Sequence, residues 1–271
     1  MTQFDKPQPD SRLKEEGLWE ISPDGTQRAV SRCWVPEVPV ALEFNGLAYA
    51  VMMATPANLE DFATGFALTE GLAASAADVT DLAVADVPQG WIVRATLAGL
   101  GVEKLTERVR ARVAESSCGL CGIENLAEVA RPLPPVAVHP PIEPQAVFAA
   151  LANLRQYQPL TRLTGAAHAA AWASPTGEIG TVREDVGRHN ALDKLIGAML
   201  LAGQLLSSGF VISTARCSYE IVEKAVRAGV TTLVCVSLPT SLAVDRARVA
   251  GLSLWALARD DSVLLVNDGS T

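Results

Sequence analysis

The chain has 271 residues, of which 49% are hydrophobic, and its formal net charge at pH 7 is -8. That length is enough for two ordinary domains, each with its own hydrophobic core. The negative charge argues against nucleic-acid binding through a basic face, so an anionic ligand would have to be bound by local arginines.

Residues 1–25 are expected to form a polar N-terminal tail. Its first part, MTQFDKPQPDSRLKEEG, lacks the hydrophobic core of a signal peptide, which argues against export. The five cysteines are an odd number in a long chain, which favours a reducing compartment over a disulfide scaffold. The most apolar stretch, 195–213, is too interrupted by polar residues and glycines to cross a membrane. These features predict a cytoplasmic protein.

Residues 26–130 are predicted to form a smaller α+β domain that ends in a Cys-x-x-Cys loop. Two apolar runs joined at Asn45-Gly46 predict a hairpin, because this pair readily takes the positive φ angles of a tight turn. A helix is expected next, capped by Thr55 and ended by Gly71. The segment 90–99 is expected to be a further strand.

The loop SSCGLCG carries Cys118 and Cys121 between glycines. A structural zinc site would need two more cysteine or histidine ligands, and no second closely spaced pair exists. A redox couple and a persulfide carrier both remain open, because a flexible loop before a helix suits either chemistry.

Residues 131–144 hold six of the sixteen prolines and are predicted to be an extended linker. Residues 145–271 then alternate between helix-like and strand-like segments, which predicts a C-terminal α/β domain with a partly parallel sheet. Ligands of such sheets bind at the carboxyl ends of strands. That rule selects residues 214–218, 239–241 and 258–262.

The passage TVREDVGRHNALDKLIG, residues 181–197, concentrates charged side chains between a strand and a helix that is expected to be capped near Asn190. Arginines there could bind phosphates in a bidentate manner, and Asp185 or His189 could orient a ring or move a proton. An ion-pair network with a helix cap explains the same residues equally well. Arg216 and Ser218 lie at the next predicted helix start, where free N–H groups favour an anion or ordinary capping.

Six motifs occur together in this order and span most of the chain: VPVALEFNGLAYAVMMATPANLEDFATGFALTEG, SSCGLCG, TGAAHAAAW, REDVGRHNALDKLIG, CSYEIVEKA and PTSLAV. In this combination the sequence resembles the FdhD family, the sulfur carriers that mature formate dehydrogenase. The resemblance implies a two-domain α/β protein whose C-terminal domain is a three-layer structure similar to the cytidine deaminase fold. The deaminase zinc signature is absent, so no metal is expected there.

The resemblance also implies an activity. A member of the family is a cytoplasmic, dimeric sulfurtransferase that accepts sulfur from a cysteine desulfurase. It passes that sulfur to the molybdenum cofactor, bis(molybdopterin guanine dinucleotide), which then enters the formate dehydrogenase apoenzyme. Cys118 would carry the persulfide and Cys121 would assist. A non-catalytic chaperone that binds this cofactor is the alternative, and a zinc or redox thiol protein is a weaker one.

The family's cofactor-binding segment falls on LARDDS, residues 257–262, where two aspartates replace the expected glycine and basic residue. Together with the charged passages, it gives the predicted cofactor-binding set: Leu257, Ala258, Arg259, Asp260, Asp261, Ser262, Arg183, Asp185, Arg188, His189, Arg216 and Ser218.

Overall fold

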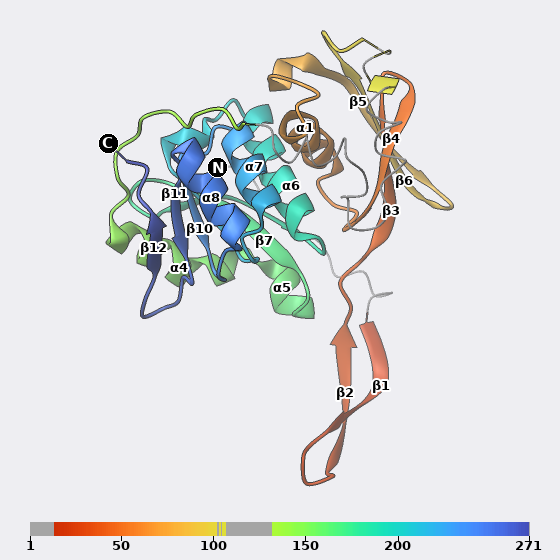
Figure 1. Cartoon of the computed structure of the whole chain (residues 1–271). Helices are drawn as coiled ribbons and strands as arrows, with labels where there is room; N and C mark the ends of the chain where they lie inside the picture. Colours follow the sequence, from red (N-terminus) through yellow and green to blue (C-terminus); the bar gives the residue numbers. More distant parts are fainter. Residues whose placement is uncertain (1–13, 102, 104, 107–131, 271) are drawn as a thin grey trace.

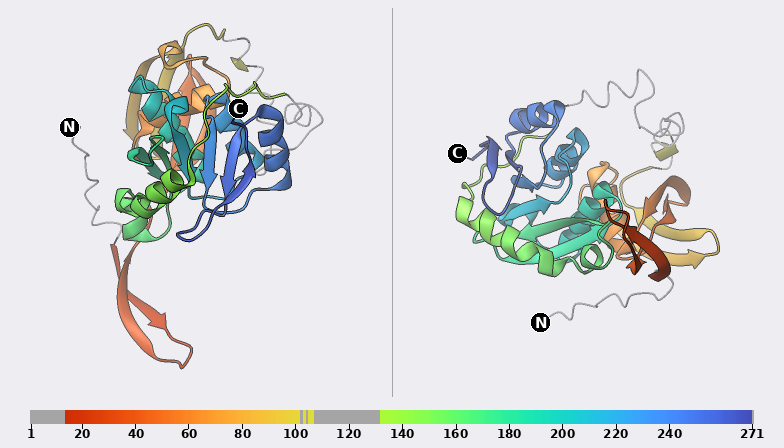
Figure 2. Two further views of the ribbon diagram at one scale, coloured as in Figure 1. Left: turned by 90° about the vertical axis from the view of Figure 1, so that its left-hand side faces the viewer. Right: turned by 90° about the horizontal axis from the view of Figure 1, so that it is seen from below.

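The structure is a computed structural model that describes residues 14–101, 103, 105–106 and 132–270. It contains two bodies, each built on its own sheet, and a hairpin that projects away from both (Figure 1). The mixed α/β character predicted from the sequence is confirmed. Figure 2 shows that the two sheets lie beside each other, with helices between them.

The N-terminal body is a four-stranded sheet in the order β4-β3-β6-β5. The expected hairpin is confirmed: β3, Val38–Phe44, and β4, Leu47–Ala54, flank Asn45 and Gly46, and both of these residues have positive φ. The expected strand at 90–99 is β6, Gly90–Leu97. After the short 3-10 helix η2, Ala76–Asp78, comes β5, Val79–Val87, a strand not predicted from the sequence.

Helix α1, Leu59–Thr69, covers one face of this sheet. Phe62 and Phe66 on the helix pack with Phe44 of β3 in a core that excludes water. The expected cap is corrected, because Asn58 in a left-handed conformation precedes the helix. The hydroxyl of Thr55 instead donates to the carbonyl of Pro36, at 3.0 Å.

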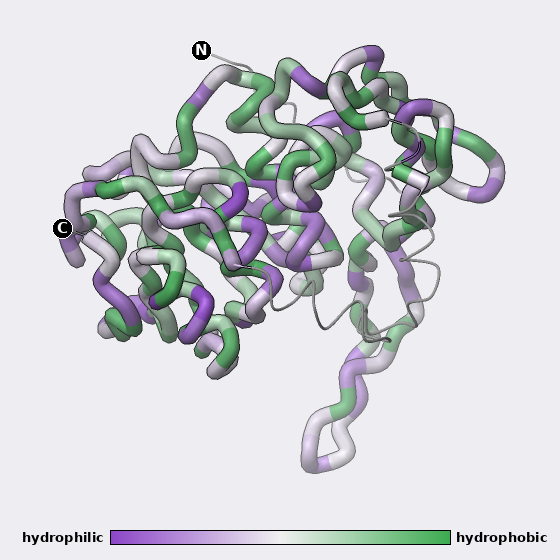
Figure 3. Tube along the Cα trace, turned by 45° about the horizontal axis from the view of Figure 1, so that its top comes forward, coloured by the Kyte–Doolittle hydropathy of each residue, from purple (hydrophilic) through white to green (hydrophobic). Residues whose placement is uncertain are grey.

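The expected polar tail, residues 1–25, is also corrected from residue 14 onward, while residues 1–13 lie outside the described residues. Strand β1, Lys14–Ile21, pairs antiparallel with β2, Gln27–Cys33. Ion pairs from Glu20 to arginines of β2 support the ribbon, while Trp19 and Ile21 are 62% and 65% exposed. Figure 3 shows hydrophilic and hydrophobic segments along this projecting hairpin.

The C-terminal body is a six-stranded sheet in the order β12-β11-β10-β9-β7-β8. Strands β9, β10 and β11 run parallel, β7 is antiparallel to both β9 and β8, and β12 is antiparallel to β11. The partly parallel sheet is therefore confirmed. The bounds are β7 His168–Ala173, β8 Ile179–Asp185, β9 Phe210–Ser213, β10 Thr232–Cys235, β11 Ser253–Ala256 and β12 Leu264–Asn267.

Helices cover both faces of this sheet, which gives the expected three layers. One face packs on α6, Arg188–Leu201, α7, Tyr219–Arg227, and α8, Ser241–Ala250. The other packs on α4, Pro144–Leu154. The remaining helical segments are η3 Arg155–Tyr157, α5 Pro159–Thr164 and η4 Leu206–Ser208.

Residues 132–143 of the predicted linker contain no helix or strand, as their prolines require. They do not stand free as a spacer, however. The Val136 N–H donates to the carbonyl of Ala250 at 2.8 Å, and Nε2 of His139 lies 3.0 Å from Oγ of Ser253. This segment therefore packs along the C-terminal body.

Among the described residues, no helix combines the length and the apolar character needed to cross a bilayer.

Candidate functional site

The carboxyl ends of four strands meet at one edge of the C-terminal sheet. Strand β8 runs in the same direction as β9, β10 and β11, because both β8 and β9 are antiparallel to β7. The segments that follow these strands are 186–189, 214–218, 236–241 and 257–262. We call this region the carboxyl edge, and it is where parallel sheets bind ligands. Ten of the twelve predicted cofactor-binding residues lie there.

His189, in the first turn of α6, joins the start of that helix to the start of α7. Its Nε2 lies 3.2 Å from Oε2 of Glu220 and 3.5 Å from Oγ of Ser218. Glu220 is half-buried, and the hydrogen bond from His189 lowers the pKa of its carboxyl against the opposing effect of burial. The structure therefore brings predicted residues His189 and Ser218 together and adds Glu220, which the sequence analysis had not selected.

Arg188 and His168 lie close to this contact. The Nε of Arg188 is buried and has no hydrogen-bond partner among the described residues. Burial lowers the pKa of His168 below its ordinary value of 6.5, and the nearby positive charge of Arg188 lowers it further. His168 is therefore neutral at pH 7. The positive charge next to the His189–Glu220 contact comes from Arg188.

The loops after β9, β10 and β11 are held to one another by main-chain hydrogen bonds. The Thr240 N–H donates to the carbonyl of Cys217, at 3.0 Å, and the Leu257 N–H donates to that of Ser237, at 3.3 Å. Helix α8 begins at Ser241, directly after Thr240, and the side chain of Thr240 caps it by accepting from the Ala243 N–H. Because the three loops are held together, a ligand at this edge would meet a fixed surface.

Leu257 has a φ of 48° although it is not glycine. A branched side chain in the left-handed region is strained, and such strain is concentrated at binding and active sites. Leu257 is also 36% exposed. The following Arg259 and Asp260 are exposed, and the Arg259 N–H closes a turn by donating to the carbonyl of Ser262, at 2.8 Å.

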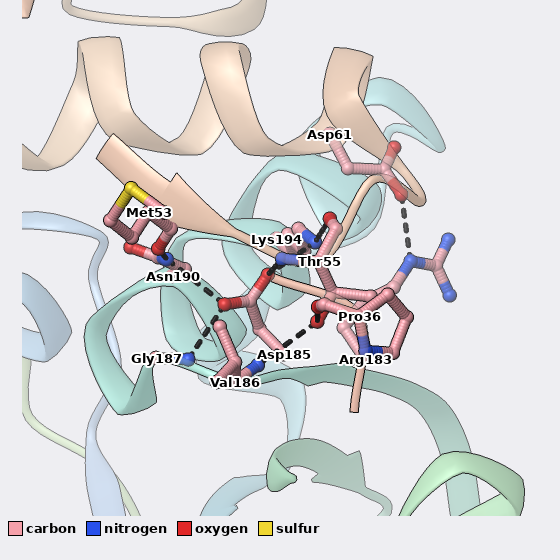
Figure 4. A network of polar contacts seen from close by, with 10 residues as sticks. All are labelled: Pro36, Met53, Thr55, Asp61, Arg183, Asp185, Val186, Gly187, Asn190 and Lys194. Atoms are coloured by element: carbon pink, nitrogen blue, oxygen red, sulfur yellow. Dashed lines mark hydrogen bonds and ion pairs between the residues drawn. The ribbon is translucent and has the colours of Figure 1, made fainter. Parts of the chain in front are cut away.

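Asp185 is a correction to the predicted set. Its buried carboxylate accepts from the Thr55 N–H at 3.0 Å, the Gly187 N–H at 2.7 Å, Nδ2 of Asn190 at 2.9 Å and Nζ of Lys194 at 2.5 Å (Figure 4). Four donors use all the acceptor positions of a carboxylate. Asp185 therefore has no atom free for a ligand, and it links the two bodies instead.

Arg183 of the predicted set lies outside the carboxyl edge and is paired with the N-terminal body. Its Nε donates to Oδ2 of Asp61 on α1 at 2.7 Å, and both side chains are largely buried (Figure 4). Neighbouring Glu184 accepts from the N–H groups of Leu160 and Thr161 and so holds the start of α5. For Arg183 and Asp185 the ion-pair interpretation of the charged passage is confirmed.

A second buried network joins the bodies further along α6. The Nζ of Lys224 lies 2.9 Å from Oδ2 of Asp193, and the hydroxyl of Thr69 lies 2.8 Å from Oδ1 of the same carboxylate. Burial alone would lower the pKa of Lys224, but the attraction of Asp193 and Glu70 outweighs it and raises that pKa. Lys224 therefore stays charged in the interior.

Cys118 and Cys121 lie outside the described residues. Of the free cysteines that are described, Cys33 is half-buried and Cys217 and Cys235 are buried. A hydrogen bond with Cys217, together with burial, raises the pKa of the Cys235 thiol well above its usual range, so the Cys235 thiol is unreactive. Within the described ranges, no three histidine, cysteine or acidic side chains are grouped to hold a metal.

The carboxyl edge therefore offers Arg188, Arg216 and Arg259 together with the starts of α6, α7 and α8. Helix starts present free N–H groups and a positive dipole end, and guanidinium groups bind phosphates in a bidentate manner. This combination fits a ligand with several phosphates. Glu220 could have been selected from the sequence, because it lies two residues after Ser218 in the same helical turn.

Comparison with known proteins gives a consistent picture. A model of the FdhD/NarQ family matches residues 35–269. The chain is 46% identical to a sulfur carrier protein FdhD of Variovorax paradoxus, over 87% of this chain and 85% of that protein. It is 44% identical to a protein of the same name from Chromobacterium violaceum, over 87% and 88% of the two chains.

Among solved structures, the fold is similar to a crystal structure from Desulfotalea psychrophila of a protein assigned as a formate dehydrogenase accessory protein. The TM-score is 0.73, and the match covers 94% of this chain and 97% of the other. At 23% sequence identity, this similarity supports the fold alone.

Proposed function

The chain belongs to the FdhD/NarQ family, and from that membership we propose that it is a sulfur carrier that serves a formate dehydrogenase. The observation that carries the proposal is the similarity to sulfur carrier proteins over most of both chains, at 46% identity for the Variovorax paradoxus protein. We further propose that it works in the cytoplasm as a homodimer and receives sulfur from a cysteine desulfurase.

Cys118 is proposed to carry the sulfur. Its thiolate attacks the outer sulfur of the desulfurase persulfide, the S–S bond of the donor breaks, and the donor cysteine leaves as a thiolate. One S–S bond forms as another breaks, so no external oxidant or reductant is required. The acceptor then attacks the outer sulfur on Cys118, the S–S bond breaks, and Cys118 leaves as a thiolate, which Cys121 assists by donating a proton to it.

The acceptor is proposed to be the molybdenum cofactor in its bis(molybdopterin guanine dinucleotide) form, bound as cargo at the carboxyl edge. Three features of this edge support the proposal: its arginines, its three helix starts and the strained backbone at Leu257. Such a surface suits the pyrophosphate groups of a dinucleotide. Asp260 and Asp261, both exposed, would oppose an anion approaching the turn directly, so Arg259 would have to reach past them.

The persulfide step is tested by mass spectrometry of the intact protein. Incubation with a cysteine desulfurase and cysteine should add one sulfur atom to the wild-type chain, and Cys118→Ser should abolish the addition. Cys33→Ser is the matched control, because Cys33 is the described cysteine that is not fully buried. A wild-type chain that stays unmodified would overturn the carrier role. If both Cys118→Ser and Cys121→Ser supported full formate dehydrogenase activity, the protein would be a binding chaperone only.

A further inference from the structure

The imidazole of His189 is held from one side only. Both of its hydrogen-bond partners, Glu220 and Ser218, approach Nε2. The Nδ1 atom has no partner among the described residues and is not a buried, unsatisfied atom. It therefore reaches the surface at the carboxyl edge, and His189 is 25% exposed.

We propose that Glu220 is a positioning residue that fixes the ring of His189 through Nε2, so that Nδ1 is the atom presented to a nucleotide phosphate or base at the carboxyl edge. This inference rests on the proposed function, because the nucleotide belongs to the proposed cargo. The assignment concerns Glu220 itself, which need not touch the ligand.

The chemistry of the carboxylate decides which ring nitrogen carries the proton. An ionised carboxylate can only accept hydrogen bonds, so Nε2 must donate to it. The lowered pKa of Glu220 keeps that carboxyl ionised, and Arg188 and Lys224 add to the effect of His189. Nδ1 is then the acceptor of a neutral ring or the second donor of a protonated one. A histidine held through one nitrogen is a common way to orient the other toward a ligand.

The charged groups around the pair come from four elements. Arg188 lies beside His189 on α6, His168 starts β7, Asp185 ends β8, and Lys224 lies one turn beyond Glu220 on α7. Asp185 and Lys224 are occupied by their own buried partners. Glu220 is thus the carboxylate near His189 that remains available to it.

An acidic residue in the first turn of a helix also stabilises the helix through its dipole. Stabilisation of the helix would not affect the tautomer of His189, so an experiment can separate this role of Glu220 from its positioning role. We expect nitrogen NMR of the unliganded protein to show His189 in the Nε2–H tautomer. Glu220→Ala should give a mixture of tautomers, while Glu220→Gln, whose amide oxygen can still accept, should keep the wild-type state.

Binding of GDP serves as the second measurement, and Glu220→Ala should weaken it about tenfold, since a hydrogen bond to a charged group is lost. Glu223→Ala is the matched control, because Glu223 lies three residues on along α7 and pairs with Arg246 at 3.6 Å. An unchanged tautomer in Glu220→Ala would overturn the positioning role. A changed tautomer with unchanged GDP affinity would overturn the contact of Nδ1 with the nucleotide. If wild-type protein failed to bind GDP, the proposed cargo would be contradicted, while the tautomer would still decide the role of Glu220.

Discussion

Gly65 of α1 and Gly197 of α6 face each other where the two helices cross. A Cβ atom on Gly65 would lie 1.8 Å from the backbone oxygen of Asp193, and one on Gly197 would lie 1.8 Å from that of Asp61. The two helix backbones are therefore in direct contact. This crossing joins the N-terminal body to the C-terminal body, and its closeness depends on the absence of both side chains.

Gly65→Ala is expected to destabilise the protein, because the added methyl group meets backbone that cannot move aside. The expected loss in the free energy of unfolding is about 2 to 3 kcal/mol, as for other overpacked sites. Urea unfolding followed by circular dichroism measures it. Gly101→Ala is the control: a Cβ there meets nothing within 4 Å, and its stability should stay within about 0.5 kcal/mol of the wild type. Equal effects of the two changes would contradict a backbone contact at the crossing.

The buried pair of Lys194 and Asp185 should matter more to stability than any surface pair. Lys194→Met leaves the carboxylate buried without its cation, which is expected to cost about 3 to 5 kcal/mol. Arg94→Ala, which breaks an exposed pair with Glu43, should cost about 1 kcal/mol or less.

The double variant Asp185→Asn with Lys194→Met removes both charges and should recover part of the loss. Chemical denaturation of the four proteins gives the comparison. A double variant as unstable as the sum of its two single variants would contradict the pairing.

The sequence predicted that charged residues cluster between β8 and α6, but it did not predict which of their side chains are buried between the two bodies. Asn190, Lys194 and Gly197 recur at helical spacing along α6, and a polar helix face ordinarily predicts solvent. Here that face packs against α1 and β4, since Nδ2 of Asn190 donates to the carbonyl of Met53 at 2.8 Å and Nζ of Lys194 to that of Thr55 at 2.8 Å. The partners are more than 130 residues away in the chain, so no local pattern could identify them.

Short sequence patterns did predict the turns and strand ends, because the conformation of these features depends on neighbouring residues. The Asn45-Gly46 turn, the partly parallel sheet of the C-terminal domain and the segments at the carboxyl edge follow from turn geometry and strand direction. The hairpin of β1 and β2 was missed, because its strands are polar on one face and carry no core-facing pattern.

His168 should make stability depend on pH below neutrality. Its pKa in the folded protein lies below the ordinary value of 6.5, because burial and Arg188 disfavour the charged form. Between the folded and the ordinary pKa the unfolded chain binds more protons, so stability is complete above pH 6.5 and falls as the pH drops toward the folded pKa. Below the folded pKa the loss is constant.

The groups that face His168 are Arg188, His189 and Asp185, and each remains in place when His168 is replaced. His168→Gln should therefore remove this part of the pH dependence and leave the rest. Thermal unfolding between pH 5 and 8 tests it. Parallel curves for the variant and the wild type would contradict a lowered pKa.

Substitutions of Leu257 test whether its positive φ costs stability and whether its side chain contributes to ligand binding at the carboxyl edge. Asparagine tolerates the left-handed region better than leucine, so Leu257→Asn should raise the free energy of unfolding by about 0.5 to 1 kcal/mol. Leu257→Ala keeps a Cβ in the same conformation and loses the rest of the side chain, so it should show no such gain. If the leucine side chain also packs against the nucleotide, both variants should bind GDP several-fold more weakly than wild type. If only Leu257→Asn bound GDP more weakly, the effect would come from the new amide group. An unchanged free energy of unfolding in Leu257→Asn would show that the leucine is not strained.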